Sequence, residues 1–446
     1  MDQTRAEEEN TFSQNIPAIM HVDINSCFAT VEQQANPRLR GVPTVVAAYV
    51  KDYGCILAAS KEAKRLGIQT GMRVKEAKSR CPFVEVRAPD PDKYRFVNHA
   101  LRTLLEHYTP DVSVESIDEM VLSLDQTPAL FSRMSGGVST ETAMNSLAVE
   151  IKHRVREQIG EWMTVSIGIA PNRYLAKVAS GLHKPDGLDS ITRGSVAQIL
   201  ASLQLEDLCG IKRGNATRLR QHGIYTPLAL YQADADTLQR AFHSIVGRQW
   251  WLRLHGYEDG VRYMSFGRSE HSSSSSVPSR QKSFGHSHAL GKPLLPKDPM
   301  VLQILSQLTK KMGMRLRQAG YTARGVGVSI SYDSYADHWH AVTTTYAPIF
   351  ADGDFFTRFR DLLARAPSQK LIRILAVYCY HLVPDLYGQQ TLFEEDRKKE
   401  HLTQAIDAIT AKWGFSAIAS GRMLDVKETV QDRISFGRVR DLARNT

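Results

Sequence analysis

Three carboxylate side chains are the best candidates in this sequence for chemistry carried out together. Asp23 follows a run of strand-like apolar residues in "AIMHVD", and Asp118 and Glu119 occur in "VESIDEMVLSL". Taken alone, Asp23 is typical of a helix cap and the Asp–Glu pair is typical of a solvated turn. On neighbouring strands of one small sheet, however, the three carboxylates would repel one another and require compensating cations. Hard divalent ions such as Mg²⁺ take oxygen ligands and meet that requirement.

The chemistry implied by such a site is nucleotidyl transfer. Two divalent ions about 4 Å apart clamp an in-line phosphoryl displacement, in which one ion activates a 3′-hydroxyl and the other holds the triphosphate. We therefore expect two Mg²⁺ ions in the active site, with Mn²⁺ as an alternative.

The elements that would position these acids follow a βαββαβ-like order. A strand at 16–25 leads into a helix and a compact segment that extends to about residue 90. A helix, a pair of strands, a second helix and a last strand follow at 92–108, 112–124, 146–160 and 164–170. This order predicts a small mixed sheet with helices over one face and an insertion after the first strand. Because consecutive strand residues point to opposite faces, Asp118 and Glu119 reach one site only where the chain bends.

A second candidate binding feature lies in residues 205–233. This stretch begins with a short apolar helix, turns at Gly210 and Ile211, and continues into a helix that ends near Gly223. It resembles a helix-hairpin-helix, whose turn amides bind a backbone phosphate of DNA. Lys212 stands where that motif usually has a second glycine, so an ordinary helical turn is the alternative.

The basic surplus of the chain is concentrated towards its C-terminus. Residues 263–388 contain 15 Lys and Arg against 8 Asp and Glu, a surplus of 7 out of +9 for the whole chain. A polyanion-binding module is one interpretation and a solvated basic surface is the other. A polar, serine-rich tether at 271–283 precedes an α+β domain. Its predicted strands are 324–333, 340–348 and 372–383, and its predicted helices are 300–320 and 352–366.

Length and composition describe a multidomain protein without membrane spans. A chain of 446 residues with 42% hydrophobic and 23% charged residues is expected to form roughly three or four domains. We find no apolar run near the roughly 18 residues that a span needs, and no secretory signal at the N-terminus. The five cysteines are scattered and never spaced as CxxC. This pattern suits a reducing cytoplasm and argues against a disulfide framework or a zinc site.

Five motifs occur in the order seen in Y-family, translesion DNA polymerases, which the chain resembles from about residue 18 to 388. They are "VDINSCFATVEQ", "ILAASKEAKRLGIQTGM", "SIDE", "VSIGIAPNRYLAKVASGLHKPDG" and the hairpin-helix stretch. The resemblance, to bacterial DNA polymerases IV and V, implies an α+β, multidomain right-hand polymerase. Such a protein has a ferredoxin-like palm, small fingers, a helical thumb with a helix-hairpin-helix, and an α+β little finger.

The resemblance also implies boundaries for these domains. We expect a flexible N-terminus (1–15), a palm (16–25 and 91–189), fingers (26–90), a thumb (190–262), a tether (263–283), a little finger (284–388) and a C-terminal tail (389–446).

Site residues are carried over one at a time from the matching motifs. By resemblance, Asp23 and Asp118 would bridge both metals, Glu119 would ligate the catalytic metal, and the carbonyl of Ile24 would complete the nucleotide metal. Phe28 matches the steric gate, an aromatic ring that collides with a ribose 2′-hydroxyl; a core phenylalanine is the alternative. The nucleotide-binding set implied in this way is Cys27, Phe28, Lys61, Lys64 and Lys184, and the DNA-binding set is Gly210, Ile211 and Lys212.

Three positions depart from the common pattern of the family. Asn25 stands where many members have a second aspartate, although members similar to the polymerase V catalytic subunit also carry asparagine. Lys61 and Lys64 stand where the family has a tyrosine and an arginine that contact the triphosphate. Both lysines keep a positive charge but lose ring stacking and bidentate geometry. We therefore expect these two substitutions to affect the affinity for the triphosphate and the rate of reaction, but not the type of reaction.

A short peptide after the last predicted strand resembles a partner-binding motif. Gln389, Leu392 and Phe393 fit the Q-x-x-L-F pattern of peptides that dock into the bacterial sliding clamp, where apolar anchors fill a pocket. The alternative is a linker whose apolar residues pack on the neighbouring domain. The remainder of the tail contains one amphipathic helix, at 399–414, which either packs back on the protein or binds a partner.

The sequence thus predicts a template-directed, low-fidelity polymerase that acts at damaged bases. Its expected partners are primer–template DNA, dNTPs and the sliding clamp, and we expect a monomer in the bacterial cytoplasm, associated with the nucleoid. A noncatalytic, clamp-bound accessory subunit is the rival interpretation, and the presence of all three acids argues against it. A nucleotide cyclase with a similar palm is disfavoured by the hairpin-helix and the basic module.

Overall fold

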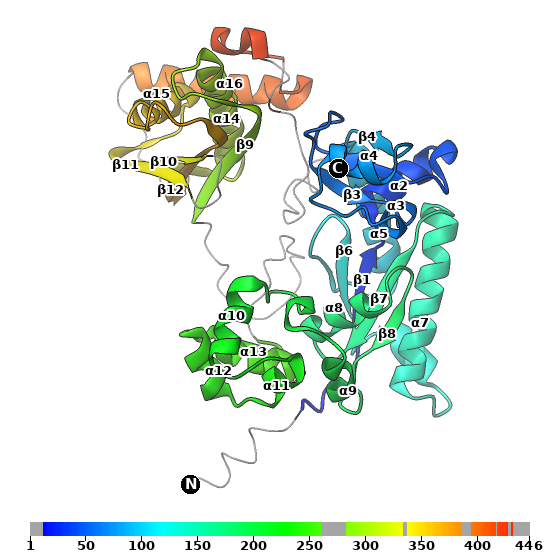
Figure 1. Cartoon of the computed structure of the whole chain (residues 1–446). Helices are drawn as coiled ribbons and strands as arrows, with labels where there is room; N and C mark the ends of the chain where they lie inside the picture. Colours follow the sequence, from blue (N-terminus) through cyan, green and yellow to red (C-terminus); the bar gives the residue numbers. More distant parts are fainter. Residues whose placement is uncertain are drawn as a thin grey trace. The chain divides into compact units, whose positions relative to one another are not determined.

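The computed structural model describes residues 12–259, 282–332, 337–384, 394–415, 417–426 and 430 (Figure 1). The chain divides into two compact units, with the boundary between Ser272 and Ser273. The described residues 12–259 lie in the first unit and those from 282 onward lie in the second. Each unit is described on its own below.

The first unit is built on a five-stranded sheet of order β5-β6-β1-β7-β8. Strand β1 lies antiparallel between β6 and β7, and β8 pairs with β7 in parallel. The strands are β1 (Ile19–Ile24), β5 (Val112–Val114), β6 (Glu119–Ser123), β7 (Val165–Ala170) and β8 (Leu188–Ser190). Both β1 and β7 are buried along almost their whole length, so this sheet is covered on both faces.

Helices cover the two faces of this sheet. On one face, α5 (Pro91–Glu106) and α7 (Thr140–Arg154) form a hydrophobic core with the strands, together with α2 (Cys27–Ala35) and α6 (Pro128–Met134). A π-helical turn, Val155–Ile159, extends α7. On the other face lies α8 (Arg173–Leu182). The predicted helices do cover one face, but the sequence did not predict α8 on the other.

A glycine allows α8 to approach the sheet closely. A Cβ atom at Gly168 of β7 would lie 2.0 Å from the carbonyl oxygen of Ala176 and 2.2 Å from the amide nitrogen of Ser180. No other residue fits there without moving the helix. The start of α8 is fixed by Asn172, whose side chain accepts a hydrogen bond from the N–H of Leu175.

The insertion after β1 forms a small subdomain of its own. Its sheet has the order β3-β2-β4 and consists of β2 (Thr44–Ala47), β3 (Ile56–Ala59) and β4 (Glu85–Arg87). The helical elements of the insertion are η1 (Pro37–Leu39), α3 (Lys61–Arg65) and α4 (Val74–Arg80). Ser60 caps α3 by accepting a hydrogen bond from the N–H of Ala63, so α3 begins at Lys61.

A helical subdomain follows β8 in the sequence and shares a hydrophobic core with α8. It consists of α9 (Val196–Ala201), η3 (Leu205–Asp207), α10 (Arg213–Gln221), α11 (Pro227–Gln232), α12 (Ala235–Phe242) and α13 (Val246–Leu254). The first helix predicted for the hairpin motif is only a 3-10 turn, η3, whereas the second is present as α10. Phe12 and Ser13 are buried, and the N–H of Ser13 donates to the carbonyl of His255. These two residues were predicted to belong to a flexible N-terminus, and that part of the prediction was wrong.

The second unit has a four-stranded antiparallel sheet of order β11-β10-β12-β9. Its strands are β9 (Ser283–Leu294), β10 (Tyr321–Ser331), β11 (His338–Ile349) and β12 (Ile372–Pro384). The sequence predicted three of these strands and missed β9. Helices α14 (Pro299–Gln318) and α15 (Asp352–Leu363) share a hydrophobic core with one face of the sheet.

The described part of the C-terminal tail packs on this second unit. It contains α16 (Glu394–Trp413) and the 3-10 helix η5 (Gly421–Val426). The ammonium of Lys310, on α14, donates to the carbonyls of Phe415 and Ile418 at 2.8 and 2.6 Å. Arg317, also on α14, forms an ion pair with Asp407. Of the two possibilities left open for this helix, packing on the protein is the one observed.

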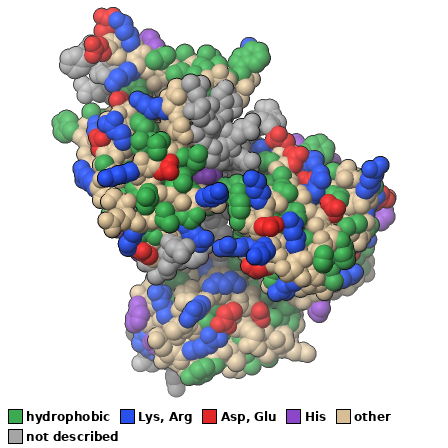
Figure 2. All heavy atoms as spheres, turned by 45° about the horizontal axis from the view of Figure 1, so that its top comes forward, with side chains coloured by type: hydrophobic (Ala, Val, Ile, Leu, Met, Phe, Trp, Pro, Cys, Tyr) green, Lys and Arg blue, Asp and Glu red, His purple; other side chains and the backbone are tan. Residues whose placement is uncertain are grey.

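In the view of Figure 2, Lys and Arg side chains are spread over the visible surface, with Asp and Glu side chains among them. Among the residues that the structure describes, none of the helices has the length and apolar character needed to cross a membrane.

Candidate active site

The predicted acids meet at one end of the five-stranded sheet. Asp23, near the end of β1, lies opposite Glu119, the first residue of β6. Asp118 immediately precedes β6, and its carbonyl oxygen accepts a hydrogen bond from the N–H of Ile24 at 2.9 Å. The chain turns between β5 and β6, as predicted, and this turn brings Asp118 and Glu119 to the same end of the sheet.

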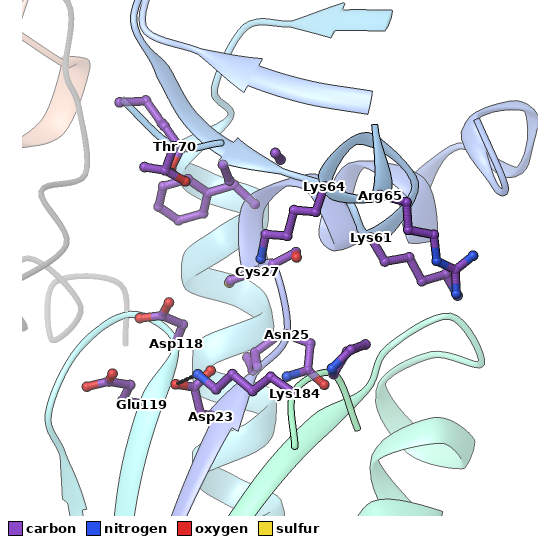
Figure 3. Close-up of a pocket in the computed structure, with 17 residues that line it drawn as sticks. Asp23, Asn25, Cys27, Lys61, Lys64, Arg65, Thr70, Asp118, Glu119 and Lys184 are labelled. Atoms are coloured by element: carbon purple, nitrogen blue, oxygen red, sulfur yellow. Dashed lines mark hydrogen bonds and ion pairs between the residues drawn. The ribbon is translucent and has the colours of Figure 1, made fainter. Parts of the chain in front are cut away.

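A cavity of about 560 Å³ opens at this end of the sheet (Figure 3). It is bounded by the end of β1, the start of β6, strand β3, the starts of α2 and α3, and the loop after α8. Every predicted acid, metal-binding and nucleotide-binding residue lines it: Asp23, Ile24, Cys27, Phe28, Lys61, Lys64, Asp118, Glu119 and Lys184. The structure therefore brings together residues up to 161 positions apart in the sequence.

Burial and nearby charges together shift the pKa values of the acids. Burial raises the pKa of Asp23 to about 6, and the nearby Lys184 opposes this rise. Burial also raises the pKa of Asp118, against a hydrogen bond from Ser116. Burial alone would raise the pKa of Glu119 as well, but His21 and Lys177 outweigh it and lower that pKa. Three carboxyl groups with such different surroundings share one small site.

Each carboxylate has a polar partner from this chain. Lys184 Nζ lies 2.6 Å from Asp23 Oδ2, and Lys177 Nζ lies 2.6 Å from Glu119 Oε2. Asp118 accepts a hydrogen bond from Ser116. With these side-chain positions, no three acid, His or Cys groups among the described residues converge closely enough to hold a metal ion.

The donor set nevertheless fits hard divalent cations. Asp23 and Asp118 are buried oxygen donors whose charged forms are poorly solvated, and Glu119 and the backbone at Ile24 lie on the same cavity. A bound cation would supply the kind of compensating charge that the ammonium groups of Lys184 and Lys177 supply in this structure.

The two lysines of α3 point in different directions. In Figure 3 the amine of Lys64 extends towards the acids, whereas Lys61 extends away from them. Burial lowers the pKa of Lys64, and the charge of Lys184 lowers it further. The ammonium of Lys61 instead lies 4.3 Å from the ring centroid of Trp162, a cation–π contact.

Phe28 is buried beneath the cavity and stacks on Tyr94. The ring centroids are 4.3 Å apart with an angle of 11° between the planes. The hydroxyl of Tyr94 donates to Glu32, a buried carboxylate that also pairs with Lys93. Phe28 is 1% exposed, as a core residue would be, and it also lines the cavity, as a steric gate would. Burial raises the pKa of the neighbouring Cys27 thiol well above its ordinary value.

The predicted DNA-binding turn lies in the helical subdomain, before α10. Gly210 adopts a left-handed backbone with φ of +91°, which favours glycine. The side chain of Ile211 is buried, and its N–H donates to the carbonyl of Leu208. Lys212 Nζ donates to the carbonyl of Glu206 at 2.9 Å. The predicted clamp-binding residues, Gln389, Leu392 and Phe393, lie outside the described residues.

Sequence reasoning missed several residues that contact the site. Lys177 lies within a motif that carried the family resemblance, but only the position of α8 over the sheet brings it to Glu119. Trp162 precedes β7 and reaches Lys61 through the fold. No short sequence spacing links either residue to its partner.

Comparisons with known proteins place the chain in a family. Residues 22–181 match the model of the impB/mucB/samB family, and residues 281–392 match the model of its C-terminal domain. The chain is similar to DNA polymerase IV 1 of Halalkalibacterium halodurans, with 30% identity over 93% of this chain and 95% of the relative. It is also similar to DNA polymerase IV 1 of Bacillus subtilis, with 31% identity over 94% of this chain and 96% of the relative.

A solved structure agrees in fold. A Y-family DNA polymerase chimera of Dbh and Dpo4 superposes with a TM-score of 0.65 at 22% sequence identity, and the match covers 82% of this chain and 99% of the chimera. The α+β, right-hand polymerase fold predicted from the sequence is thereby confirmed. Together with the curated relatives, this result shows that the chain belongs to the Y family of DNA polymerases.

Proposed function

We propose that this polymerase adds dNTPs opposite damaged template bases, with low fidelity, by a two-metal nucleotidyl transfer. The observation that carries the proposal is the convergence of Asp23, Asp118 and Glu119 on a cavity that also receives lysines from two other segments. Bound Mg²⁺, or Mn²⁺, would supply Lewis-acid stabilisation of the attacking and leaving oxygens.

The residues of this chain have separate tasks in that reaction. Asp23, Asp118 and Glu119, which line the cavity, would hold the metal ions. Lys184 and Lys64, whose ammonium groups face the acids, bind the triphosphate. The ring of Phe28, held by Tyr94, excludes a ribose 2′-hydroxyl.

A primer-extension assay tests the proposal. Purified chain, a primer–template with an abasic site or a bulky adduct, dNTPs and Mg²⁺ should give extension across the lesion. The rival proposal of a noncatalytic accessory subunit predicts DNA binding without extension, even on undamaged template. An intact template copied with high accuracy but blocked at every lesion would contradict the translesion role.

The two lysines of α3 give a matched pair of variants. Lys64→Met should raise the KM for dNTP about tenfold, since a partly desolvated cation near the triphosphate is removed. Lys61→Met should raise it about twofold or less, because Lys61 is turned towards Trp162. Equal effects from both variants would mean that the direction of Lys61 changes when nucleotide binds.

We further propose a division of tasks along the chain that follows the expected boundaries. The palm (16–25 and 91–189) carries catalysis, the fingers (26–90) cover the nucleotide, and the thumb (190–262) holds DNA through the turn at Gly210, Ile211 and Lys212. The little finger (284–388) binds the primer–template duplex. The protein acts as a monomer on nucleoid DNA in the bacterial cytoplasm.

Recruitment by the sliding clamp is proposed for the segment at 389–393. Replacing Leu392 and Phe393 by Ala removes two apolar anchors, each worth about 1.5–3 kcal/mol when fully buried. Affinity for a bacterial clamp should fall at least about a hundredfold, while extension on DNA without a clamp stays unchanged. If clamp affinity persists and thermal stability falls instead, the two residues are packing residues.

A further inference from the structure

Asn25 makes two hydrogen bonds that join distant parts of the active site. It directly follows β1, two positions after Asp23, and is 6% exposed. Its Nδ2 donates to Ser166 Oγ, on β7, at 2.8 Å. Its Oδ1 accepts from the backbone N–H of Asp186 at 2.8 Å. Both ends of this amide are therefore engaged, and neither of these two bonds is to a predicted metal ligand.

The second of these bonds holds the loop that carries Lys184. This loop runs from the end of α8 to β8, and Asp186 within it has φ of +63°, a left-handed conformation that aspartate tolerates. The N–H of Gly187 donates to Ser166 Oγ at 3.3 Å, so Asn25 and the loop share this hydroxyl. Lys152, from α7, donates to the carbonyls of Asp186 and Gly187 on the other side.

The loop is thus fixed to two strands and one helix, and the side chain of Lys184 projects from it to Asp23. Asn25, directly after the strand that bears Asp23, holds the backbone of this loop at Asp186. A fixed loop backbone of this kind limits the positions that the ammonium of Lys184 can take relative to the carboxylates.

We propose that Asn25 is a positioning residue for Lys184, and that it sets the distance between the acid cluster and the lysine that binds the triphosphate. This inference rests on the role given to Lys184 in the proposed function. It assigns a task to a position at which this chain departs from the commoner aspartate.

The hydrogen-bonding pattern accounts for a residue with a side-chain acceptor at this position, either asparagine or aspartate. The N–H of Asp186 needs an acceptor, which both asparagine and aspartate provide. The hydroxyl of Ser166 rotates, so it accepts from the amide of asparagine or donates to a carboxylate. An apolar residue of the same size provides no acceptor and leaves a backbone donor without a partner, which disfavours the loop conformation.

The test is a double-mutant cycle on the full-length chain with undamaged primer–template, Mg²⁺ and dNTP. The variants are Asn25→Leu, Asn25→Asp, Lys184→Met, and the double variant Asn25→Leu/Lys184→Met. For each, single-turnover extension gives the dNTP Kd and the maximal rate, and separate titrations give DNA affinity and Tm. These readouts distinguish a local effect on nucleotide binding from a general loss of structure.

We expect Asn25→Leu to weaken dNTP binding about tenfold, the size expected when a buried backbone donor is left without its acceptor. Asn25→Asp should stay within about threefold of the wild type, because it keeps the acceptor. Lys184→Met should weaken dNTP binding at least about tenfold. The double variant should be no weaker than Lys184→Met by more than about twofold, because Asn25 acts through Lys184.

Additive effects in the double variant, of about a hundredfold, would overturn the inference, as would an unchanged dNTP Kd in Asn25→Leu. If Lys184→Met itself leaves the dNTP Kd unchanged, the triphosphate role in the proposed function fails, and the inference fails with it. Weaker dNTP binding in Asn25→Leu alone would then point to a direct contact.

Ser166→Ala supplies an independent variant in case Asn25→Leu does not fold. It removes the hydroxyl that binds both Asn25 and Gly187 but keeps the acceptor for Asp186. The expected decrease in dNTP affinity is about threefold, and it too should vanish when combined with Lys184→Met. A decrease that persists in that background would contradict the inference.

Discussion

The sheets of the two units differ in what their polar residues do. In the five-stranded sheet, β1 and β7 are buried on both faces, and the polar side chains Asp23, Glu119 and Ser166 collect around one end. In the four-stranded sheet, β12 buries alternate residues along its central part against α14 and α15 and leaves the residues between them partly exposed. Tyr378 and Tyr380 lie on that more open face, over Gly327 and Gly325.

This difference separates two ways of handling a charged polymer. At a buried sheet end the carboxylates lose contact with water. Their pKa values shift, and their charged forms are stabilised when cations lie nearby. An open sheet face keeps its charges in water, where they attract phosphate over a distance but are weakened by salt. We therefore expect the rate of nucleotide addition to depend on the five-stranded sheet and the affinity for duplex DNA to depend on the four-stranded sheet. Each prediction below tests this separation.

The largest effect should come from the acids at the sheet end. Asp118→Ala or Glu119→Ala should lower the maximal extension rate by about three orders of magnitude or more, since each change removes a proposed ligand of the metal ions. DNA affinity should stay near normal. Glu115→Gln is the matched control, because Glu115 pairs with Arg173 and lies outside the cavity lining. More than about a tenth of the wild-type rate in both alanine variants would refute the metal site.

A smaller but more specific effect is expected at Phe28. Phe28→Ala should lower the preference for dNTP over rNTP, measured as the ratio of kcat/KM values, by at least about tenfold because the 2′-hydroxyl gains room. Phe96→Ala is the control, since Phe96 is 72% exposed on α5. If Phe28→Ala leaves the ratio of kcat/KM values for dNTP and rNTP unchanged but lowers Tm, Phe28 is a core residue only.

The pH dependence of stability offers a test of burial at Asp23. Its folded pKa of about 6 exceeds its ordinary value of 3.8, so between these pH values the folded state binds more protons than the unfolded state. Stability of the metal-free protein should therefore fall as pH rises through this range, by about 2–3 kcal/mol relative to Asp23→Asn. Chemical denaturation of both proteins at several pH values measures the difference. Saturating Mg²⁺ should stabilise the wild type and not the variant, and parallel pH profiles would contradict the shift.

The open sheet should control the salt dependence of DNA binding. Lys292 and Arg324 are exposed residues of β9 and β10. Replacing both by Gln should reduce the slope of log K against log salt by about 0.9 for each DNA phosphate that they neutralise. Extension at saturating DNA should stay unchanged, and Arg360→Gln, on α15, is the control. A slope equal to that of the wild type would mean that these charges lie away from DNA.

Much of the fold could be predicted because its signals are local. The apolar run of β1, which contains Asp23, and the periodic patterns of α5, α14 and α15 are clear in the sequence. Strand β9 was missed because it contains glycine, proline and two histidines, and the pairing with β12 holds it in place. The short strand β4 has only three residues, too few for a pattern.

The residues of the site also fall into two groups, those that could be predicted from local motifs and those that could not. The acids, Phe28 and Lys184 were found through motifs, and all of them line the cavity. Lys177 and Trp162 act through contacts between elements far apart in sequence, which no single stretch encodes. The different directions of Lys61 and Lys64 likewise depend on what surrounds α3.

Gly168 has a consequence for how this enzyme can vary between strains. Any side chain there would overlap the backbone of α8, so even one extra methyl group would push away the helix that carries Lys177. A screen for loss of polymerase activity should therefore recover substitutions at Gly168 as well as at the acids, although glycine offers no functional group. Mapping such mutations would identify a structurally essential position that a search for reactive side chains would miss.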